Sequence, residues 1–153
     1  MTALIALAVT VNAPPGRITD ALSTGEGLAS FWTVDSHAEP QPGSVARFGF
    51  GGPRLEIRVD QLDPGRRVTW TCLRDFPMPP GQWRGTTVTW DLTRGDDGGA
   101  GVLLQHGNWP DSLTQAELAS TAYTWSLVLT ALKGYAETGK HQPVFAAAHA
   151  RES

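Results

Sequence analysis

The feature that most constrains the fold is a long apolar stripe near the C-terminal end of the sequence. Six residues recur there at intervals of four, three, four, three and four positions: Leu118, Ala122, Trp125, Leu129, Leu132 and Ala136. This spacing places all six on one side of a single α-helix. Thr114 and Glu117 form a capping-box pattern at its start. Gly139 ends it, and Pro143 cannot continue it. A helix of about 25 residues measures about 37 Å, which is long enough to cross a whole sheet.

The preceding sequence alternates apolar and polar residues, which is typical of half-buried β-strands. We predict strands around residues 5–11, 34–38, 44–51, 54–60, 66–74, 84–94 and 101–109. Their apolar faces carry Ile5, Leu7, Val9 and Val11; Ala46, Phe48 and Phe50; Leu55, Ile57 and Val59; Val68, Trp70 and Cys72; Val88, Trp90 and Leu92; and Val102, Leu104 and His106. Short turns such as 63–65 and 95–99 join consecutive strands, so neighbours pair antiparallel.

Two short helices are predicted between the first and second strands, at 17–23 and 26–32, with a break at 24–27. Helices and antiparallel strands in this order indicate an α+β fold. The 153 residues fit one domain, which we place at 1–143, followed by an Ala-rich tail at 144–153 that we expect to be loosely held. No Lys or Arg precedes the apolar run 1–11, which favours a strand over a signal peptide. Nothing in the sequence approaches the ~20 apolar residues of a membrane span.

Composition excludes several function classes. The net charge is −3, with 12 basic and 15 acidic residues, so no basic field is expected to attract nucleic acid. The single cysteine, Cys72, excludes an internal disulfide and suits a reducing cytoplasm. The four histidines lack metal-ligand spacing, and neither a phosphate-binding loop nor a Gly-x-Ser-x-Gly elbow occurs. We therefore expect no metal and no cofactor.

Few residues of the predicted inner face could carry chemistry. His106 is either a satisfied structural histidine or a polar anchor or acid–base group in an apolar cavity. Cys72 reads as a small buried hydrophobe, because no cation near it in sequence would stabilise a thiolate. Asp35 and His37 share a face of the weak second strand and are reserve candidates for pocket polarity. Three carboxylates are predicted to face outward: Glu56, Asp60 and Asp91.

Tryptophan is abundant, with six residues: Trp32, Trp70, Trp83, Trp90, Trp109 and Trp125. If Trp70, Trp90 and Trp125 all point inward, the sheet and the long helix enclose a wide aromatic space. The proline-rich stretch 76–81 is a loop that we place at the mouth of this space.

The order of these elements and several short motifs resemble a known family. The residues that carry the resemblance are Asn12-Ala13-Pro14-Pro15, Glu26-Gly27-Leu28-Ala29-Ser30-Phe31-Trp32, Pro42-Gly43-Ser44-Val45-Ala46-Arg47-Phe48, the run Val59–Trp70, Gln105-His106-Gly107-Asn108-Trp109, Tyr123-Thr124-Trp125, Leu129-Thr130-Ala131-Leu132-Lys133 and Gly139. The chain resembles the START-like, or SRPBCC, superfamily, and within it the group of activator-of-heat-shock-ATPase homologues. It departs from that group at Gly107-Asn108, where a glycine commonly stands directly before the aromatic residue.

The resemblance implies a helix-grip fold: a curved antiparallel sheet of about seven strands around the long helix, with a cavity between them for hydrophobic or amphipathic molecules. Our leading hypothesis is a non-enzymatic domain that binds a hydrophobic or aromatic small molecule, as a monomer or homodimer. The lining residues would be Trp32, Phe48, Trp70, Trp90, His106 and Trp125. One alternative is a cyclase, dehydratase or isomerase that uses His106 with Asp35 or His37. Another is a stress-related, co-chaperone-like interaction module.

Overall fold

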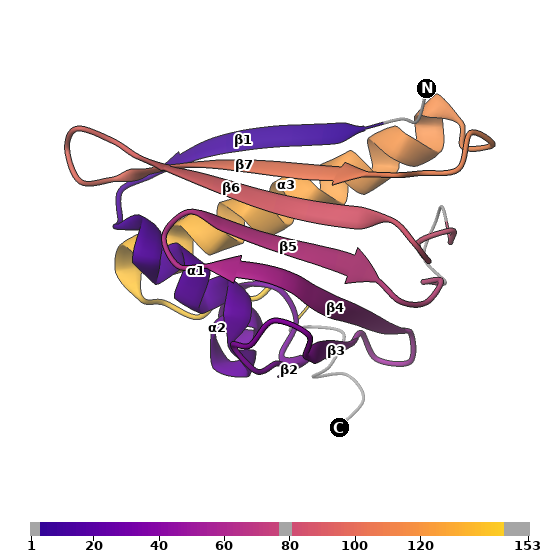
Figure 1. Cartoon of the computed structure of the whole chain (residues 1–153), viewed down its shortest axis with the longest axis horizontal. Coiled ribbons are helices and arrows are strands. Elements are labelled where there is room, and N and C mark those ends of the chain that lie inside the picture. The colour runs from indigo at the N-terminus through magenta and orange to yellow at the C-terminus, as the bar shows by residue number, and fades with distance from the viewer. Residues whose placement is uncertain (1–3, 77–80, 146–153) are drawn as a thin grey trace.

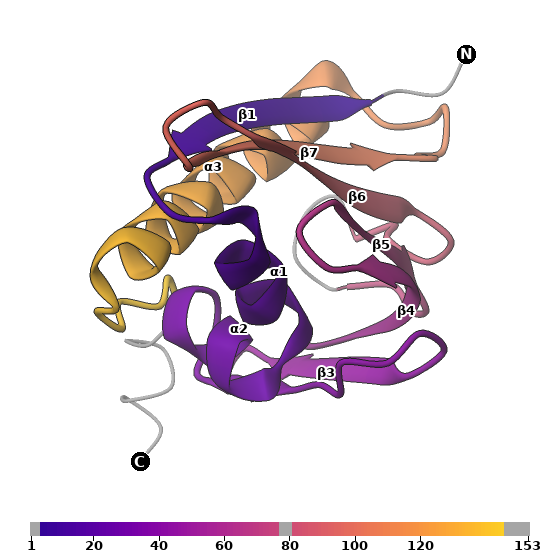
Figure 2. The same cartoon turned by 60° about the vertical axis from the view of Figure 1, so that its left-hand side comes forward.

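A seven-stranded antiparallel sheet curves around one long helix in the computed structural model, which describes residues 4–76 and 81–145 (Figure 1). The strands are β1 (Ile5–Val11), β2 (Asp35–His37), β3 (Val45–Gly49), β4 (Arg54–Asp63), β5 (Arg67–Cys72), β6 (Thr87–Arg94) and β7 (Ala100–Gly107). The helices are α1 (Pro15–Ser23), α2 (Gly25–Phe31) and α3 (Gln115–Thr138). The strand order is β1-β7-β6-β5-β4-β3-β2, and α3 lies along the concave face of the sheet (Figures 1 and 2). This is the predicted helix-grip arrangement.

In every strand except the short β2, the alternation in the sequence correctly predicted which face is buried. In β5, Val68, Trp70 and Cys72 are almost fully buried, whereas the residues between them are partly exposed. The same pattern holds in β7, where Leu104 and His106 are completely buried. Every second side chain of a strand points to the same face, so this regular burial fixes the pairing register of the sheet.

The capping and stop signals of α3 are confirmed. Thr114 Oγ1 accepts a hydrogen bond from the Glu117 amide at 3.1 Å, and the Glu117 carboxylate accepts from the Thr114 amide at 2.9 Å. Gly139 ends the helix with a φ of 77°, the left-handed conformation that glycine adopts without a steric cost. Four of the six stripe residues are buried, and the other two, Leu118 and Ala122, are partly buried against the core.

The structure differs from the predicted boundaries where a local contact overrides the pattern. The predicted break at 24–27 is instead the first turn of α2, because Thr24 Oγ1 caps the helix by accepting from the Gly27 amide at 3.0 Å. A Cβ atom at Gly27 would meet the backbone of Ala21 at 2.5 Å, so α1 and α2 can approach only with glycine there. β6 begins at Thr87 rather than at 84, since a turn closed by the Thr86 amide and the Trp83 carbonyl precedes it.

β7 ends at Gly107 because the next residue leaves the extended conformation. Asn108 has a φ of 64°, which asparagine tolerates better than most side-chain-bearing residues. Its side-chain amide donates to the Gly85 carbonyl at 2.8 Å, and Trp109 Nε1 donates to the His106 carbonyl at 2.9 Å. The Gly107-Asn108 departure is therefore accommodated by an ordered turn.

The segment that follows α3 returns to the end of α2. The amides of Gln142, Val144 and Phe145 donate to the carbonyls of Ser30, Phe31 and Trp32, at 3.0–3.1 Å. The last carbonyls of a helix have no partner within it, so this segment completes the hydrogen bonding of α2. Val144 and Phe145, which we assigned to a loosely held tail, pack against the core. The predicted tail from 146 onward and positions 77–80 of the predicted loop lie outside the described residues.

Side chains of α3 bond backbone groups at the end of the edge strand β1. Lys133 Nζ donates to the Thr10 carbonyl at 2.6 Å and to the Glu137 carboxylate at 2.7 Å. That carboxylate also accepts from the Asn12 amide at 2.7 Å. These bonds occupy backbone groups that would otherwise be open to another strand.

Candidate functional site

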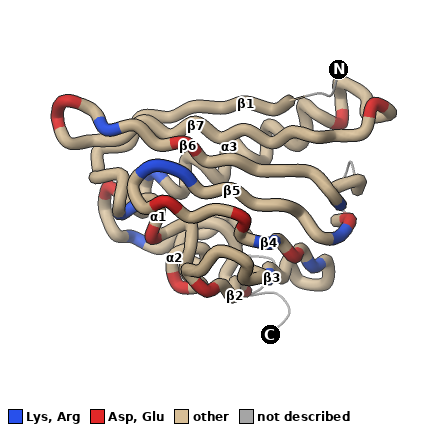
Figure 3. Tube along the Cα trace, in the orientation of Figure 1, with Lys and Arg blue, Asp and Glu red and all other residues tan. Residues whose placement is uncertain are grey.

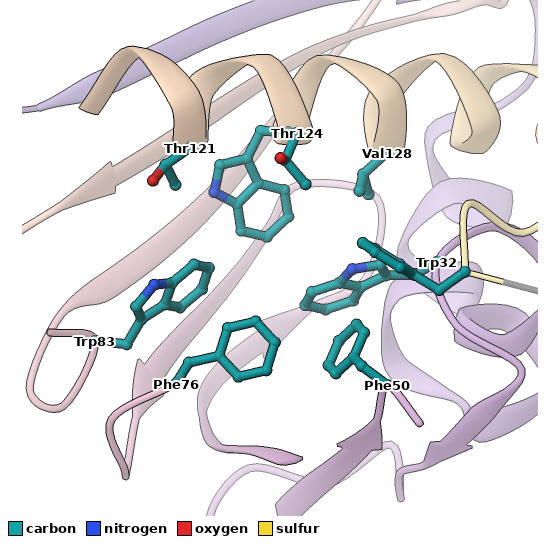
Figure 4. A pocket seen from close by; sticks show the side chains of 9 residues that line it. Trp32, Phe50, Phe76, Trp83, Thr121, Thr124 and Val128 are labelled. Atoms are coloured by element: carbon teal, nitrogen blue, oxygen red, sulfur yellow. The ribbon is translucent and has the colours of Figure 1, made fainter. Parts of the chain in front are cut away.

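A small cavity opens between α3 and the loops at one end of the sheet (Figure 4). Its wall consists of Trp32, Phe50, Phe76, Trp83, Thr121, Thr124, Trp125, Val128 and Phe145. It offers about 30 Å³ to the centre of a water-sized molecule, which is room for about one or two waters. Six of the nine wall residues are aromatic, and no charged side chain of the described chain contributes to the wall.

Each wall residue is positioned by one of three parts of the fold. Thr121, Thr124 and Val128 follow one another at helical spacing on α3. Trp32 is the residue that ends α2. Trp125 also belongs to α3, and the other four aromatic rings come from connecting segments: Phe50 after β3, Phe76 after β5, Trp83 before β6, and Phe145 after α3. The regular elements thus form the back of the cavity, and the connecting segments form its mouth.

Two of the six predicted lining residues, Trp32 and Trp125, reach the cavity wall. The structure places Phe48, Trp70, Trp90 and His106 in the packed layer directly behind it. The ring centroid of Trp32 lies 4.5 Å from that of Phe48 and 6.1 Å from that of Trp70, with the two indoles stacked. Trp90 meets Trp125 edge to face at 5.8 Å. The alternation identified inward side chains, but α3 packs so closely on the sheet that most of them fill the core. Whether any of the six binds a ligand stays a prediction.

His106 is completely buried, and both of its ring nitrogens have partners. Trp125 Nε1 donates to Nδ1 at 3.0 Å, which requires Nδ1 to be unprotonated. Nε2 therefore carries the proton and donates to Thr86 Oγ1 at 2.9 Å. The Thr86 hydroxyl in turn donates to the Trp83 carbonyl at 2.6 Å. This chain of bonds links helix α3 to strand β7 and to the loop before β6.

Burial lowers the pKa of His106 from 6.5 to about 3, because the protonated imidazole would lose its hydration. The ring is therefore neutral at physiological pH. With both nitrogens engaged, it offers no free donor or acceptor to the cavity. Of the two hypotheses for His106, the geometry matches the first, a structural histidine whose hydrogen bonds are satisfied.

Asp35 and His37 lie on the outer face of the sheet, away from the aromatic cavity. His37 is directly opposite Arg47 in the β2–β3 pair, and Arg47 is opposite Glu56 in the next pair. Side chains at paired positions share a face, so these residues form a small polar cleft outside. The His37 Nε2 and Asp35 Oδ1 atoms are 3.1 Å apart there. The reserve assignment of Asp35 and His37 to pocket polarity was wrong, because the register turns both outward.

Cys72 is buried in the core, as the alternation predicted. Burial raises the pKa of its thiol from 9.0 to about 11, because the thiolate would lose its hydration. The thiolate, which is the reactive form, is therefore scarce at neutral pH.

Sequence reasoning missed most of the cavity wall. The predicted mouth loop did include Phe76, which lines the wall. Phe50 was read only as an inward strand residue, and Phe145 only as part of the tail. Because residues in loops have no fixed periodicity, the alternation could not show where these rings point. The useful signal was composition, because aromatic rings stabilise a fold mainly when they are buried, and this applies to rings in loops as well.

Basic and acidic residues are interspersed along the chain, mainly in the turns and around α1 and α2 (Figure 3). Within 4–76 and 81–145, no cluster of three or more His, Cys, Asp or Glu residues could hold a metal ion. No helix in the described part of the chain is both long enough and apolar enough to cross a bilayer.

A curved sheet that grips a long helix, with an apolar cavity between them, defines the START-like, or SRPBCC, class of proteins. The family described as "Activator of Hsp90 ATPase homolog 1-like protein" matches residues 12–137, and the chain belongs to it. The Aha1 dimer from Colwellia psychrerythraea is 30% identical, with a TM-score of 0.77, and the match covers 90% of this chain and 98% of that one.

Two further structures are similar in fold. DynU16, from the dynemicin biosynthetic locus, is 24% identical with a TM-score of 0.71, over 90% of this chain and 48% of that chain. Protein BH1534 from Bacillus halodurans is 21% identical with a TM-score of 0.69, over 90% of this chain and all of that one. A search of curated proteins finds no match.

Proposed function

We propose that the protein is a non-catalytic binding domain whose cavity takes an apolar, aromatic small molecule. The observation that carries this proposal is the composition of the wall: six aromatic rings, one valine and two threonines. Ligand sites of this kind are mostly apolar, with a few polar groups that orient the ligand. Burial of apolar surface would supply most of the affinity, at about 25 cal/mol per Å² before the costs of association.

The cavity must widen to hold such a ligand, since sites for drug-sized molecules measure about 300–1,000 Å³. The rings at the mouth come from connecting segments, whereas α3 and the strands carry the closely packed core. Phe145 is only partly buried, so its ring can turn aside at a lower cost than a core ring. The proposal therefore places ligand entry beside Phe145.

The wall argues against an acid–base enzyme. Acid–base catalysis requires groups that exchange protons near the working pH. The polar side-chain groups that the described wall offers are two threonine hydroxyls and indole N–H groups, and none of these titrates near neutrality. His106 lies behind the wall with its pKa lowered to about 3.

Calorimetric titration with a panel of lipids, flavonoids and polyketides tests the proposal. Val128→Phe adds a ring on the cavity side of α3 and should abolish binding. Leu127→Phe adds the same ring to a side chain that is 41% exposed and should leave binding intact. Circular dichroism establishes that both variants fold. Saturable binding that survives Val128→Phe, or no binding by any compound, contradicts the proposal.

We further infer that the protein forms a homodimer in a reducing, cytoplasmic compartment. The 30%-identical relative is described as a dimer, and the outer face of α3 exposes Tyr123 and Leu127 at 67% and 41%. The single buried cysteine suits a compartment without disulfides. Sedimentation equilibrium should give twice the monomer mass for the wild type. Tyr123→Lys should give the monomer mass, whereas the control Thr138→Lys should still give the dimer mass. A monomeric wild type contradicts the inference.

A further inference from the structure

Trp83 belongs to the wall of the cavity, and its buried indole nitrogen is a hydrogen-bond donor with no partner in the part of the chain that the structure describes. Trp83 is 7% exposed and lines the cavity. Its Nε1 atom is buried and has no hydrogen-bond partner among residues 4–76 and 81–145. Buried polar groups almost always have a partner, because leaving one unpaired costs the hydrogen bond that water would supply. An unpaired donor at a binding site therefore indicates that the ligand carries a hydrogen-bond acceptor.

Comparison with other indoles shows why Trp83 matters. Trp109 and Trp125 both donate to His106, to its carbonyl and its Nδ1 atom. Trp90 Nε1 is also buried and has no partner among the described residues, but Trp90 lies behind the wall and does not line the cavity. Of these indoles, Trp83 is the one that both lines the cavity and has a buried N–H group without a partner among the described residues.

The threonines of the wall do not supply donors. The Thr121 hydroxyl donates to the Glu117 carbonyl at 3.0 Å, and the Thr124 hydroxyl donates to the Ser120 carbonyl at 3.3 Å. Their protons are used within α3. In Figure 4 the nitrogen-bearing edge of Trp83 is turned toward Thr121 across the cavity. The indole N–H therefore supplies a donor on this side.

Three neighbouring rings hold Trp83 in this orientation. It meets Phe76 edge to face at 5.4 Å, Trp109 at 5.8 Å and the imidazole of His106 at 4.8 Å. Its carbonyl also accepts the Thr86 hydroxyl. A donor fixed in advance binds its acceptor with little loss of conformational freedom.

The charge of the wall restricts the ligand further. No Lys, Arg or protonated His of the described chain lines the cavity, so an anion would lack a partner. Aromatic faces attract cations, but the described wall contains no carboxylate, and the positive end of the Trp83 N–H dipole opposes a cation. A neutral ligand with an acceptor oxygen fits both conditions.

We propose that the ligand is a planar aromatic ketone or quinone whose carbonyl oxygen accepts a hydrogen bond from Trp83 Nε1. This inference rests on the proposed binding function and specifies its ligand class. It excludes a plain hydrocarbon as the preferred ligand, because a hydrocarbon would leave the indole donor unpaired.

The experiment uses 9-fluorenone and fluorene, which share a flat three-ring shape and differ by one carbonyl group. Calorimetric titration of the full chain should give about three- to tenfold tighter binding of fluorenone, as expected for one net hydrogen bond. Trp83→Phe removes the donor and keeps an aromatic ring, so it should bring the affinity ratio close to one while fluorene still binds. The control Trp90→Phe should keep the wild-type ratio.

Equal affinities in the wild type, or a ratio that survives Trp83→Phe, would overturn the ketone inference while leaving the binding proposal in place. If neither fluorenone nor fluorene binds, the result contradicts both the ketone inference and the binding proposal. Preferential binding of tetramethylammonium would also overturn the inference, since it would identify a cation site. If Trp83→Phe does not fold, ¹H–¹⁵N spectra of the wild type test whether the ligand accepts a hydrogen bond from Trp83. Fluorenone should move the Trp83 indole proton downfield and fluorene should not, and equal shifts would overturn the inference.

Discussion

Trp125 on α3 donates its indole proton to Nδ1 of His106 on β7, across 3.0 Å of buried core. This bond joins the long helix to the sheet, and it fixes which nitrogen of His106 carries the proton. Since Trp125 is itself part of the cavity wall, the same bond holds one side of the proposed binding site.

Trp125→Phe should destabilise the protein more than Trp90→Phe does. Both changes remove the same atoms from a buried indole, but only the first leaves a buried acceptor, His106 Nδ1, without its donor. The expected difference in the free energy of unfolding is about 1–3 kcal/mol, measured by urea unfolding with circular dichroism. Equal losses would mean that the Trp125–His106 bond contributes nothing.

Stability should fall as the pH is lowered from about 6.5 toward 3. In this window the unfolded chain takes up a proton at residue 106, whereas burial keeps the folded imidazole neutral. Protons then favour the unfolded state, by about 1.4 kcal/mol per pH unit from this residue. Above pH 6.5 the imidazole is neutral in both the folded and the unfolded chain, so this loss of stability is absent there.

Urea unfolding at pH 7 and pH 5 measures this dependence. His106→Gln lowers stability at both values but should reduce the difference between them, because glutamine does not titrate. The same difference in wild type and variant would show that other groups cause the pH dependence.

Phe145→Ala should open the mouth of the cavity. The side chain is partly buried and contacts Phe50 edge to face at 5.0 Å, so its loss should destabilise the fold by about 1–3 kcal/mol. Association of fluorene, followed by stopped-flow fluorescence, should become faster. The neighbouring control Val144→Ala removes a partly buried side chain outside the wall and should leave the association rate unchanged. A rate that does not respond to Phe145→Ala would place ligand entry elsewhere.

Glu137→Gln should increase hydrogen exchange at the Asn12 amide. Hydrogen bonds from Lys133 and from this amide lower the pKa of Glu137, so the charged carboxylate is the form that holds the end of β1. Glutamine is a weaker acceptor and forms no ion pair. Glu117→Gln, at the other end of α3, should leave the Asn12 amide protected. Unchanged exchange in both variants would show that packing alone protects it.

The sequence predicted the fold well, because the fold depends on periodic patterns. Alternation placed Trp70, Trp90 and His106 inward, and the four-three spacing of the helix stripe placed Trp125 toward the sheet. Family resemblance then supplied the curvature of the sheet around the helix and the presence of a cavity.

The wall of the cavity was harder to predict, because it depends on contacts between distant segments. No periodicity links Phe145 to Phe50, and the partners of His106 are 19 and 20 residues away, on α3 and in the loop before β6. The orientation of Asp35 and His37 required the β2–β3 register, which a three-residue strand hardly encodes. Whether an inward ring lines a cavity or fills the core depends on how closely the helix packs, and sequence alone does not give that distance.

Phe50, Phe76, Trp83 and Phe145 contribute to the wall from outside the regular elements, whereas His106 and Trp90 belong to the strands behind it. Substitutions at the first four positions can therefore change what the mouth admits without disturbing the pairing of a single strand. In a lineage of such proteins, ligand preference could diverge rapidly while the sheet and its helix stay the same.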